Sequence, residues 1–331
     1  MKTHAAKLIS AKTFSISDHE LAKPAADDVV MEVLSCGICS SEIPIYDGRL
    51  IGSPGVSFRY AAYPSDLGHE VVGRVVEVGD KVSDLASGDI VTGLTYSGCG
   101  FAEHFIETQV SLVKVPASWH DRAELAVGEP LMATMNIIKQ IDLKPGDRAL
   151  IVGDGFMSLL LVAALKEQGV EQIILAGHHD DKLALGAELG ASHTVNGKTD
   201  NVWEYVMDLT NGEGVEISVE YAGNAAALQL AASLTKAKSR AKLVLAGAYD
   251  NDMPFTIGNY LQNRAPILVP AYPNHSFDKA RDLIDAMDAL DRGVFPMEKL
   301  ITHRYALDRV GQGYDDLIGR ADGYIKGIVL P

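Results

Sequence analysis

The stretch "ALIVGDGFMSLLLVAALKEQG", residues 149–169, decides the fold class of this chain. An apolar run ends at Gly153, a second glycine follows at Gly155, and a helical pattern begins directly after it. The first glycine permits a tight turn, and the second lets the backbone approach a pyrophosphate held at the helix N-terminus, beside Phe156 and Met157. The stretch therefore predicts a dinucleotide-binding turn, and the alternative is a plain tight turn between a strand and a helix.

Apolar strand patterns and helical patterns alternate from this stretch onward. The expected strands are "RALIVG" (148–153), "QIILAG" (172–177), "EISVEYAG" (216–223) and "KLVLAGAY" (242–249). Strands that are apolar throughout are typical of a parallel sheet covered by helices on both faces. This part of the chain is predicted to be a doubly wound parallel-sheet domain.

The end of the second expected strand bears on which nicotinamide cofactor is bound. In a dinucleotide fold this strand usually ends in an acidic residue that bonds the adenosine ribose hydroxyls. The residues near this place are Gly177, His178, His179 and Lys182. Because no carboxylate repels a 2′-phosphate and basic groups are available to bond one, we expect NADP(H) to be favoured over NAD(H). Two alternatives stay open: Asp180 or Asp181 turns back to the ribose, or the histidines are merely solvated.

The region before about residue 115 has a different pattern of short segments. Its β-branched segments, each bounded by Gly, Asp or Ser, are 29–35, 71–79, 89–94 and 104–108. This pattern is typical of a compact all-β module. Near the C-terminus a helical pattern at 277–293 is followed by two further strand-like segments.

Length and composition exclude several classes of protein. The 331 residues are enough for two domains, and a formal net charge of −15 argues against nucleic acids and anionic membranes as partners. No apolar run approaches the ~20 residues needed to cross a membrane, and the N-terminus lacks a secretory signal, so a cytoplasmic location is expected. The three cysteines, Cys36, Cys39 and Cys99, are too few for a disulfide framework or a four-cysteine zinc site.

Candidate metal ligands lie in separate segments of the first half of the chain. Cys39 follows an apolar stretch, His69 and Glu70 open "HEVVGRVVEVG", and Glu129 lies in "GEPLMA". A thiolate, an imidazole and a carboxylate from separate loops make a tetrahedral zinc site that keeps one position for water or substrate. We expect such a catalytic site here, and whether Glu70 or Glu129 binds the ion at rest stays open.

Together these motifs resemble the zinc-dependent medium-chain alcohol and polyol dehydrogenases, and "EPL" at Glu129 resembles their sorbitol dehydrogenase-like branch. The matching segments are "GICSSE" (37–42), "GHEVVGRVVEVG" (68–79), "GFAEHF" (100–105), "EPL" (129–131), "PGDRALIVGDG" (145–155), "LITH" (300–303) and "IKGIVL" (325–330). The resemblance implies an α/β fold with a GroES-like β-rich catalytic domain, 1–128, completed by 271–331. A Rossmann domain, 129–270, is inserted between the two parts.

The resemblance also implies catalytic roles. Cys39 and His69 match zinc ligands, Glu70 the adjacent carboxylate, and Glu129 a third or fourth ligand. Ser41 matches the hydroxyl that bonds the substrate oxygen and takes its proton. The implied reaction passes a hydride between a nicotinamide cofactor and a secondary alcohol or polyol, or the corresponding ketone or aldehyde.

The chain departs from the family pattern at several places. Many members hold a second, structural zinc in a lobe of four cysteines; only Cys99 lies here, so one catalytic zinc and no structural zinc are expected. Pro44 replaces the proton-relay histidine of some branches, and Glu42 stands where Asp is usual. Water, a ribose hydroxyl or another side chain must then carry the proton. The candidate side chains are Tyr46, Asp47 and His104. Cys36 matches no ligand position and is predicted to be a core residue.

Further residues are expected along the cofactor by resemblance. They are Gly223, Gly247, Ala248 and Tyr249, with Lys326 reaching the pyrophosphate. Family members commonly pair the edges of their cofactor-domain sheets, so a homodimer or homotetramer is expected, with "APILVPAY" (265–272) as the candidate edge. Two other functions stay open: a zinc-free NADPH-dependent double-bond reductase, and a non-catalytic dinucleotide-binding protein.

Overall fold

The chain divides into two compact units. The computed structural model describes residues 1–331 except 54–61, 96–99, 248, 250–253, 257 and 274–275. The first unit consists of Met1–Met132 and Leu283–Pro331, and the second of Ala133–Asp282. The breaks fall inside helices α2 (Gly128–Ile141) and α8 (Lys279–Asp291). No helix among the described residues is both long enough and apolar enough to span a membrane.

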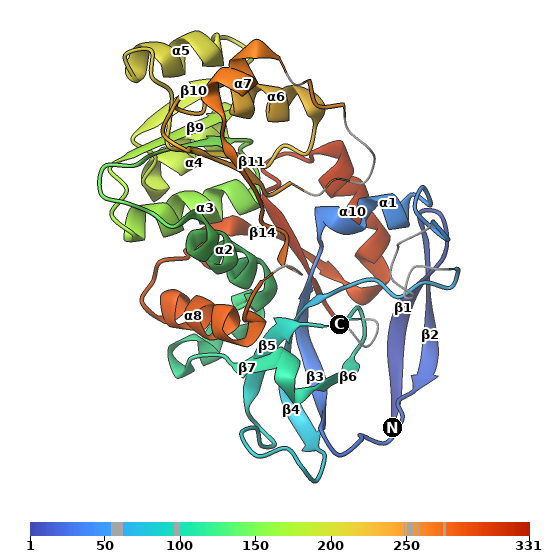
Figure 1. The fold of residues 1–331 in the computed structure, drawn as a ribbon. Coiled ribbons are helices and arrows are strands. Elements are labelled where there is room, and N and C mark those ends of the chain that lie inside the picture. Colours follow the sequence, from blue (N-terminus) through green and yellow to red (C-terminus); the bar gives the residue numbers. More distant parts are fainter. Residues whose placement is uncertain (54–61, 96–99, 248, 250–253, 257, 274–275) are drawn as a thin grey trace. The chain divides into compact units, whose positions relative to one another are not determined.

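The first unit is built on one large sheet. In the described chain its strand order is β14-β15-β3-β4-β5-β7, with β6 paired to β3. The strands are β3 (Asp28–Gly37), β4 (Glu70–Val78), β5 (Ile90–Leu94), β6 (His104–Thr108), β7 (Leu112–Lys114), β14 (Ile301–Ala306) and β15 (Lys326–Leu330). Strand β15 runs antiparallel to β3, with Ile328 opposite Gly37 and Val329 opposite Cys36. The C-terminal segment therefore completes the sheet that the N-terminal part begins (Figure 1).

A hairpin and several short helices complete the first unit. They are β1 (Lys2–Ser10), β2 (Thr13–Glu20), η1 (Ser40–Glu42), α1 (Ile43–Tyr46), η3 (Gln109–Ser111), η4 (Ala117–Leu125), α9 (Met297–Leu300), η6 (Leu307–Arg309) and α10 (Val310–Gly319). Buried aromatic rings join α1 to α10, because Tyr46 stacks on Tyr314 with their centroids 4.7 Å apart. This packing brings Tyr314 beside η1, the segment that follows Cys39.

The second unit contains a six-stranded parallel sheet, as far as the residues described extend, in the order β10-β9-β8-β11-β12-β13. Its strands are β8 (Arg148–Val152), β9 (Gln172–Gly177), β10 (His193–Asn196), β11 (Ile217–Glu220), β12 (Lys242–Leu245) and β13 (Ile267–Pro270). Its helices include α3 (Phe156–Glu167), α4 (Asp180–Leu189), α5 (Val202–Leu209), α6 (Ala225–Ser233) and α7 (Asn259–Arg264).

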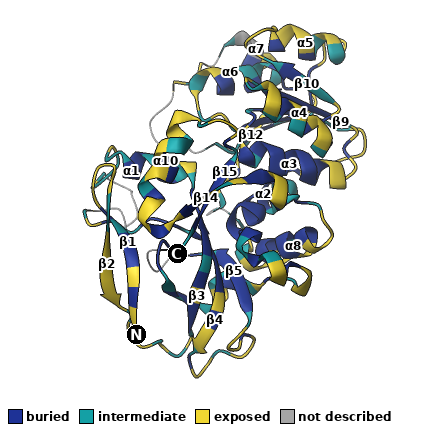
Figure 2. Ribbon diagram, turned by 180° about the vertical axis from the view of Figure 1, so that it is seen from behind, coloured by how far each residue is buried: buried dark blue, intermediate teal, exposed yellow. Residues whose placement is uncertain are grey.

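Helices cover both faces of this sheet. Ile174 of β9 belongs to a buried cluster with Val206 of α5 and Leu228 of α6. The next residue, Leu175, points to the other face and packs against Gly186 of α4. Helix α3, on that face, is buried along almost its whole length (Figure 2). The predicted fold class is confirmed: a β-rich unit completed by the C-terminal segment, and a doubly wound parallel-sheet unit.

Candidate metal centre and dinucleotide turn

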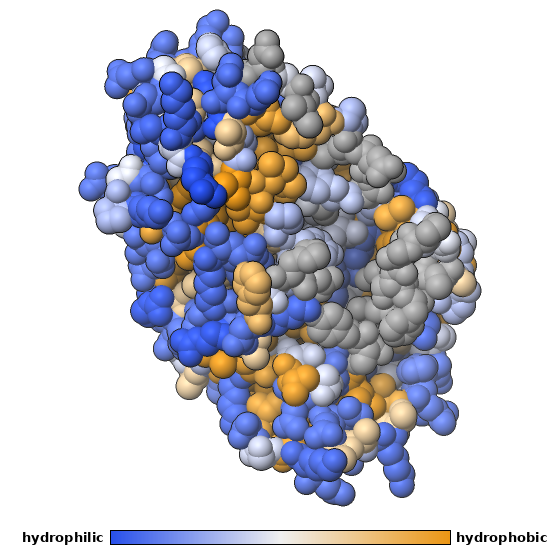
Figure 3. Space-filling model, viewed as in Figure 1, coloured by the Kyte–Doolittle hydropathy of each residue, from blue (hydrophilic) through white to orange (hydrophobic). Residues whose placement is uncertain are grey.

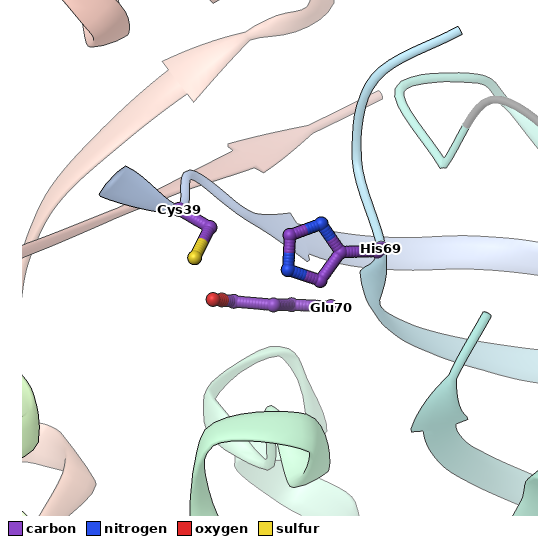
Figure 4. Close-up of side chains that lie close together, drawn as sticks. All are labelled: Cys39, His69 and Glu70. Atoms are coloured by element: carbon purple, nitrogen blue, oxygen red, sulfur yellow. The ribbon is translucent and has the colours of Figure 1, made fainter. Parts of the chain in front are cut away.

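Three predicted metal ligands meet in the first unit. Cys39 lies just after β3, while His69 precedes β4 and Glu70 begins it. The antiparallel ladder of β3 and β4 sets Gly37 opposite Glu70, which brings the two strand ends together. One ligand atom from each of Cys39, His69 and Glu70 lies within 4.8 Å of the others. Figure 4 shows the sulfur of Cys39 and the ring of His69 turned toward the carboxylate of Glu70.

Glu42 orients the histidine of this cluster. Its Oε1 lies 3.0 Å from Nδ1 of His69 and accepts the backbone N–H of Gly68 at 2.9 Å. The hydroxyl of Tyr314 donates to the other carboxylate oxygen at 2.7 Å. With Nδ1 held by a carboxylate, Nε2 of His69 is the nitrogen that remains for a metal ion. A glutamate thus reaches the orienting position even though an aspartate is usual there.

Lys326 lies in the same cluster. Its buried Nζ is 2.7 Å and 2.5 Å from the two carboxylate oxygens of Glu70, and it donates to the carbonyl of Ile38 at 2.9 Å. Gly37 makes room for this pair, because a Cβ there would lie 1.8 Å from Oε2 of Glu70. A pyrophosphate contact was predicted for Lys326, whereas its ammonium is engaged by Glu70 and belongs to the first unit. The only local signal was a lysine opening the apolar strand "KGIVL".

Acidic groups dominate the electrostatics of this cluster. Burial by itself lowers the pKa of His69, but Glu42 and Cys39 outweigh burial and raise it well above its usual value. The pKa of Lys326 is also raised, since Glu70 and Cys39 outweigh its burial. Burial raises the pKa of Glu129 to about 7, and the charges of His69 and Glu70 are close enough to affect it.

The donor set fits a zinc ion. A soft thiolate, an imidazole and carboxylates are the ligands that zinc takes in catalytic sites, and a divalent cation offsets their accumulated negative charge. Glu129, in the first turn of α2, is buried beside this set but is not among the three atoms that meet within 4.8 Å.

The remaining predicted residues of the first unit are placed as follows. The hydroxyl of Ser41 lies 3.1 Å from the sulfur of Cys39. Cys36 is fully buried, and burial raises the pKa of its thiol, as suits the predicted core residue. Tyr46 is buried with its hydroxyl donating to Asp315 at 3.0 Å. Of the other proton-relay candidates, Asp47 pairs with Arg49, and His104 lies opposite Glu32 in the sheet. Cys99 lies outside the described residues.

The glycine-rich turn of the second unit joins β8 to α3. Gly153 has a φ of +123°, a backbone conformation that favours glycine, and a Cβ at Gly155 would meet nothing within 4 Å. Helix α3 starts at Phe156, and the residue before it offers no side-chain cap. A helix N-terminus in this position favours an anionic group such as a pyrophosphate. Because the strand order reverses between β8 and β11, this turn lies at the topological switch point, where such sheets bind dinucleotides.

The other predicted cofactor residues of this unit follow the carboxyl ends of neighbouring strands. Gly177 ends β9, Gly223 follows β11 and Gly247 follows β12. Exposed His178 and partly buried His179 and Lys182 follow β9, and exposed Tyr249 follows β12. Partly buried Met157 lies in the first turn of α3, after β8. Ala248 lies outside the described residues. The strand ends thus gather these residues along one edge of the sheet.

Glu220, which was not predicted, joins two of these loops. Its Oε1 accepts the backbone N–H of Gly223 at 2.7 Å, and its Oε2 accepts the hydroxyl of Tyr249 at 2.5 Å. Burial raises the pKa of this carboxyl group. A glutamate at the end of a strand pattern was the available signal, and its bonds stabilise the turn after β11.

Comparison with known families assigns both parts of the chain. Residues 25–124 match the alcohol dehydrogenase GroES-like domain, and residues 157–287 match the zinc-binding dehydrogenase domain. The sorbitol dehydrogenase of Bacillus subtilis strain 168 is 26% identical over 338 residues, covering 92% of this chain and 90% of the relative. The chain belongs to the zinc-type medium-chain alcohol dehydrogenase family and is an NAD(P)-dependent oxidoreductase.

Solved structures share the fold over the full length. A zinc-binding dehydrogenase of Sinorhizobium meliloti 1021, determined bound to NADP, has a TM-score of 0.85 at 24% identity and covers 100% of both chains. The 2R,3R-butanediol dehydrogenase of Bacillus subtilis has a TM-score of 0.83 at 24% identity and covers 99% of both chains. The two family matches and the sorbitol dehydrogenase relative do not favour the zinc-free reductase or the non-catalytic protein.

Proposed function

We propose that this enzyme oxidises a secondary alcohol or polyol, or reduces the corresponding carbonyl, at one catalytic zinc. The observation that carries the proposal is the meeting of Cys39, His69 and Glu70 within 4.8 Å. These residues would hold a zinc ion that polarises the substrate oxygen, and the nicotinamide would take or give the hydride. Glu129 is the alternative carboxylate ligand, and no structural zinc is proposed.

Other residues of the first unit orient the ligands of this site, balance their charge and carry the substrate proton. Glu42 fixes the ring of His69, and Lys326 offsets the charge of Glu70. Ser41 is proposed to relay the substrate proton: its hydroxyl, 3.1 Å from the sulfur of Cys39 and thus beside the metal position, takes this proton and passes its own to water or a ribose hydroxyl. The protein's contribution is to hold the substrate oxygen next to a hydroxyl that passes the proton on.

The substrate class rests on the relatives and on the acidic donor set. The relative from Bacillus subtilis acts on sorbitol by its name, and one of the similar solved structures is a butanediol dehydrogenase. A carboxylate near the metal, from Glu70 or Glu129, suits hydroxylated substrates because it can accept a hydroxyl hydrogen bond. We therefore propose a small polyhydroxylated or secondary alcohol.

The cofactor is proposed to bind at the turn after β8. The predicted preference for NADP(H) over NAD(H) is supported by His178, His179 and Lys182 near the end of β9, and by the relative that binds NADP. This preference is opposed by the carboxylate of Asp154, which lies beside Gly177 at the end of β9, where the sequence has no acidic residue.

An oligomer is proposed to form through the edge of the second sheet. Strand β13 ends the sheet and leaves Ile267 and Leu268 exposed by 37% and 49%. Figure 3 shows apolar side chains gathered at the surface of this unit near α6 and α7. An exposed apolar edge favours pairing with another copy, so a homodimer or homotetramer is proposed, in the cytoplasm.

Metal analysis with a matched pair of cysteine variants tests the proposed function. The protein purified without chelator is expected to hold about one zinc per chain, with Cys39→Ala losing it and Cys36→Ala retaining it. The wild type is then screened with secondary alcohols and polyols and both cofactors. Absence of zinc from the wild type would overturn the proposal in favour of the zinc-free reductase. Two zinc ions per chain would refute the absence of a structural site.

A further inference from the structure

The carboxylate of Asp154 reaches from the glycine-rich turn to the end of β9. Its Oδ2 accepts the backbone N–H groups of His178 and His179 at 2.6 Å and 2.8 Å. The imidazole Nδ1 of His179 lies 3.0 Å from the same oxygen and 3.1 Å from Oδ1. Burial alone raises the pKa of Asp154, but these bonds outweigh burial and lower it, so the group is charged at neutral pH.

This side chain fills the space of a missing one. A Cβ built on Gly177 would lie 2.4 Å from both Cβ and Oδ2 of Asp154. Gly177 is not among the residues with positive φ, so its backbone would accept a side chain and only the space forbids one. In an aspartate at position 177, the carboxylate carbon would be bonded directly to that Cβ. Asp154 therefore presents a carboxylate in the region that the usual strand-end acid occupies.

The bonding capacity of this carboxylate matches a ribose better than a phosphate. A carboxylate has about four acceptor sites, and the two amides and one imidazole nitrogen leave room for another donor. A ribose 2′-hydroxyl is such a donor. A 2′-phosphate brings only acceptor oxygens and negative charge, and the contact would be repulsive.

We propose that Asp154, from the glycine-rich turn, is the specificity-determining residue that reads the ribose 2′ position and biases the enzyme toward the unphosphorylated cofactor. Gly177 is the complementary residue that makes room for it. This inference rests on the proposed cofactor site at the turn after β8. The bias is defined relative to variants that lack the carboxylate of Asp154. The basic groups His178, His179 and Lys182 act in the opposite direction, because they favour a phosphorylated cofactor.

Calorimetric titration with cofactor fragments tests the inference without turnover. ADP-ribose and 2′-phospho-ADP-ribose are titrated into the wild type, Asp154→Asn and Asp181→Asn. Removing one charge at Asp154 is expected to shift the ratio of the two dissociation constants about tenfold or more toward the phosphorylated ligand, the scale of one like-charge contact. Asp181→Asn removes the same charge from an exposed place in the first turn of α4 and is expected to change the ratio less than about twofold.

A relocation variant separates recognition from loop support. Asp154→Gly combined with Gly177→Asp returns the acid to the strand end, and the wild-type ratio is expected to be restored relative to Asp154→Gly alone. If loosening of the loop were the whole effect, both ligands would weaken equally and the ratio would stay fixed, which overturns the inference. A shift in Asp181→Asn instead of Asp154→Asn would also overturn it. If neither ligand binds the wild type, the proposed cofactor site itself fails and this inference fails with it.

Discussion

Replacing Lys326 by methionine should destabilise the first unit strongly. The ammonium and the carboxylate of Glu70 form a buried pair, with side chains 6% and 1% exposed. Methionine keeps an unbranched chain of similar length but removes the charge. The carboxylate of Glu70 is then left without its cation, in a region that already holds Glu129 and Cys39.

The expected magnitude follows from burial. Removing one partner of a buried ion pair costs about 3–5 kcal/mol, because the remaining charge is neither solvated nor paired. The hydrogen bond from Lys326 to the carbonyl of Ile38 is lost as well, and that carbonyl adds about 1 kcal/mol if it stays unpaired. The double variant Lys326→Met with Glu70→Gln removes both charges and should recover at least about 2 kcal/mol of the loss.

Tryptophan fluorescence can follow the first unit selectively. The chain has two tryptophans, of which Trp119 is buried in the first unit and Trp203 lies 43% exposed in the second. In a Trp203→Phe background, urea unfolding monitored by Trp119 gives the free energy of unfolding of that unit. All variants are compared in protein stripped of zinc by a chelator, because an ion that binds only the folded chain adds to stability by mass action and Glu70 is itself a proposed ligand.

Two results would contradict a stabilising ion pair between Lys326 and Glu70. A loss below about 1 kcal/mol in Lys326→Met would mean that Glu70 is solvated or paired elsewhere in the folded chain. A double variant no more stable than Lys326→Met would mean that the two charges do not stabilise each other.

Two further predictions concern the second unit. Burial raises the pKa of Glu216, but Arg148 and Lys236 outweigh it and hold the pKa at about 2; the resulting stability is present above about pH 4.5 and is lost as the pH falls toward 2. Glu216→Gln should therefore cost about 1–2 kcal/mol of unfolding free energy at pH 7, after allowance for solvent screening. Urea unfolding followed by circular dichroism should show a smaller difference from the wild type at pH 3. A difference independent of pH would refute this prediction. Asn201 caps α5 by accepting its first backbone amides at 3.1 Å and 3.3 Å, so Asn201→Ala should cost about 1 kcal/mol while Asn201→Asp costs less in the same assay, and equal losses would argue against the cap.

The fold was predictable where the pattern is local. Alternation of buried strands with helices defines the parallel sheet, and the strand expected at 172–177 is β9. The strand expected at 216–223 stops at Glu220, because the carboxylate of Glu220 binds the N–H of Gly223 and turns the chain. The hairpin β1–β2 was not predicted, since β2 is mostly exposed and polar and shows no apolar alternation (Figure 2).

The candidate site was predictable only as far as residue types and resemblance allowed. Cys39, His69 and Glu70 were grouped from their chemistry, and the structure brings them together. Lys326 joins them from 256 residues beyond Glu70, a distance that no local pattern encodes. Pairing of β15 with β3 is what carries it there, so its neighbours follow from sheet topology alone.

Three glycines show why such sites resist prediction from sequence. Gly37, Gly177 and Gly247 lie at or just after strand ends, where glycine ordinarily indicates a turn, yet none has a positive φ. A Cβ at each would lie 1.8, 2.4 and 2.9 Å from a carboxylate oxygen of Glu70, Asp154 and Glu220, respectively. These glycines are explained by the space that a buried carboxylate needs. In every case the carboxylate comes from another segment of the chain. The need for glycine therefore becomes visible only in the folded structure, where that carboxylate occupies the space of a side chain.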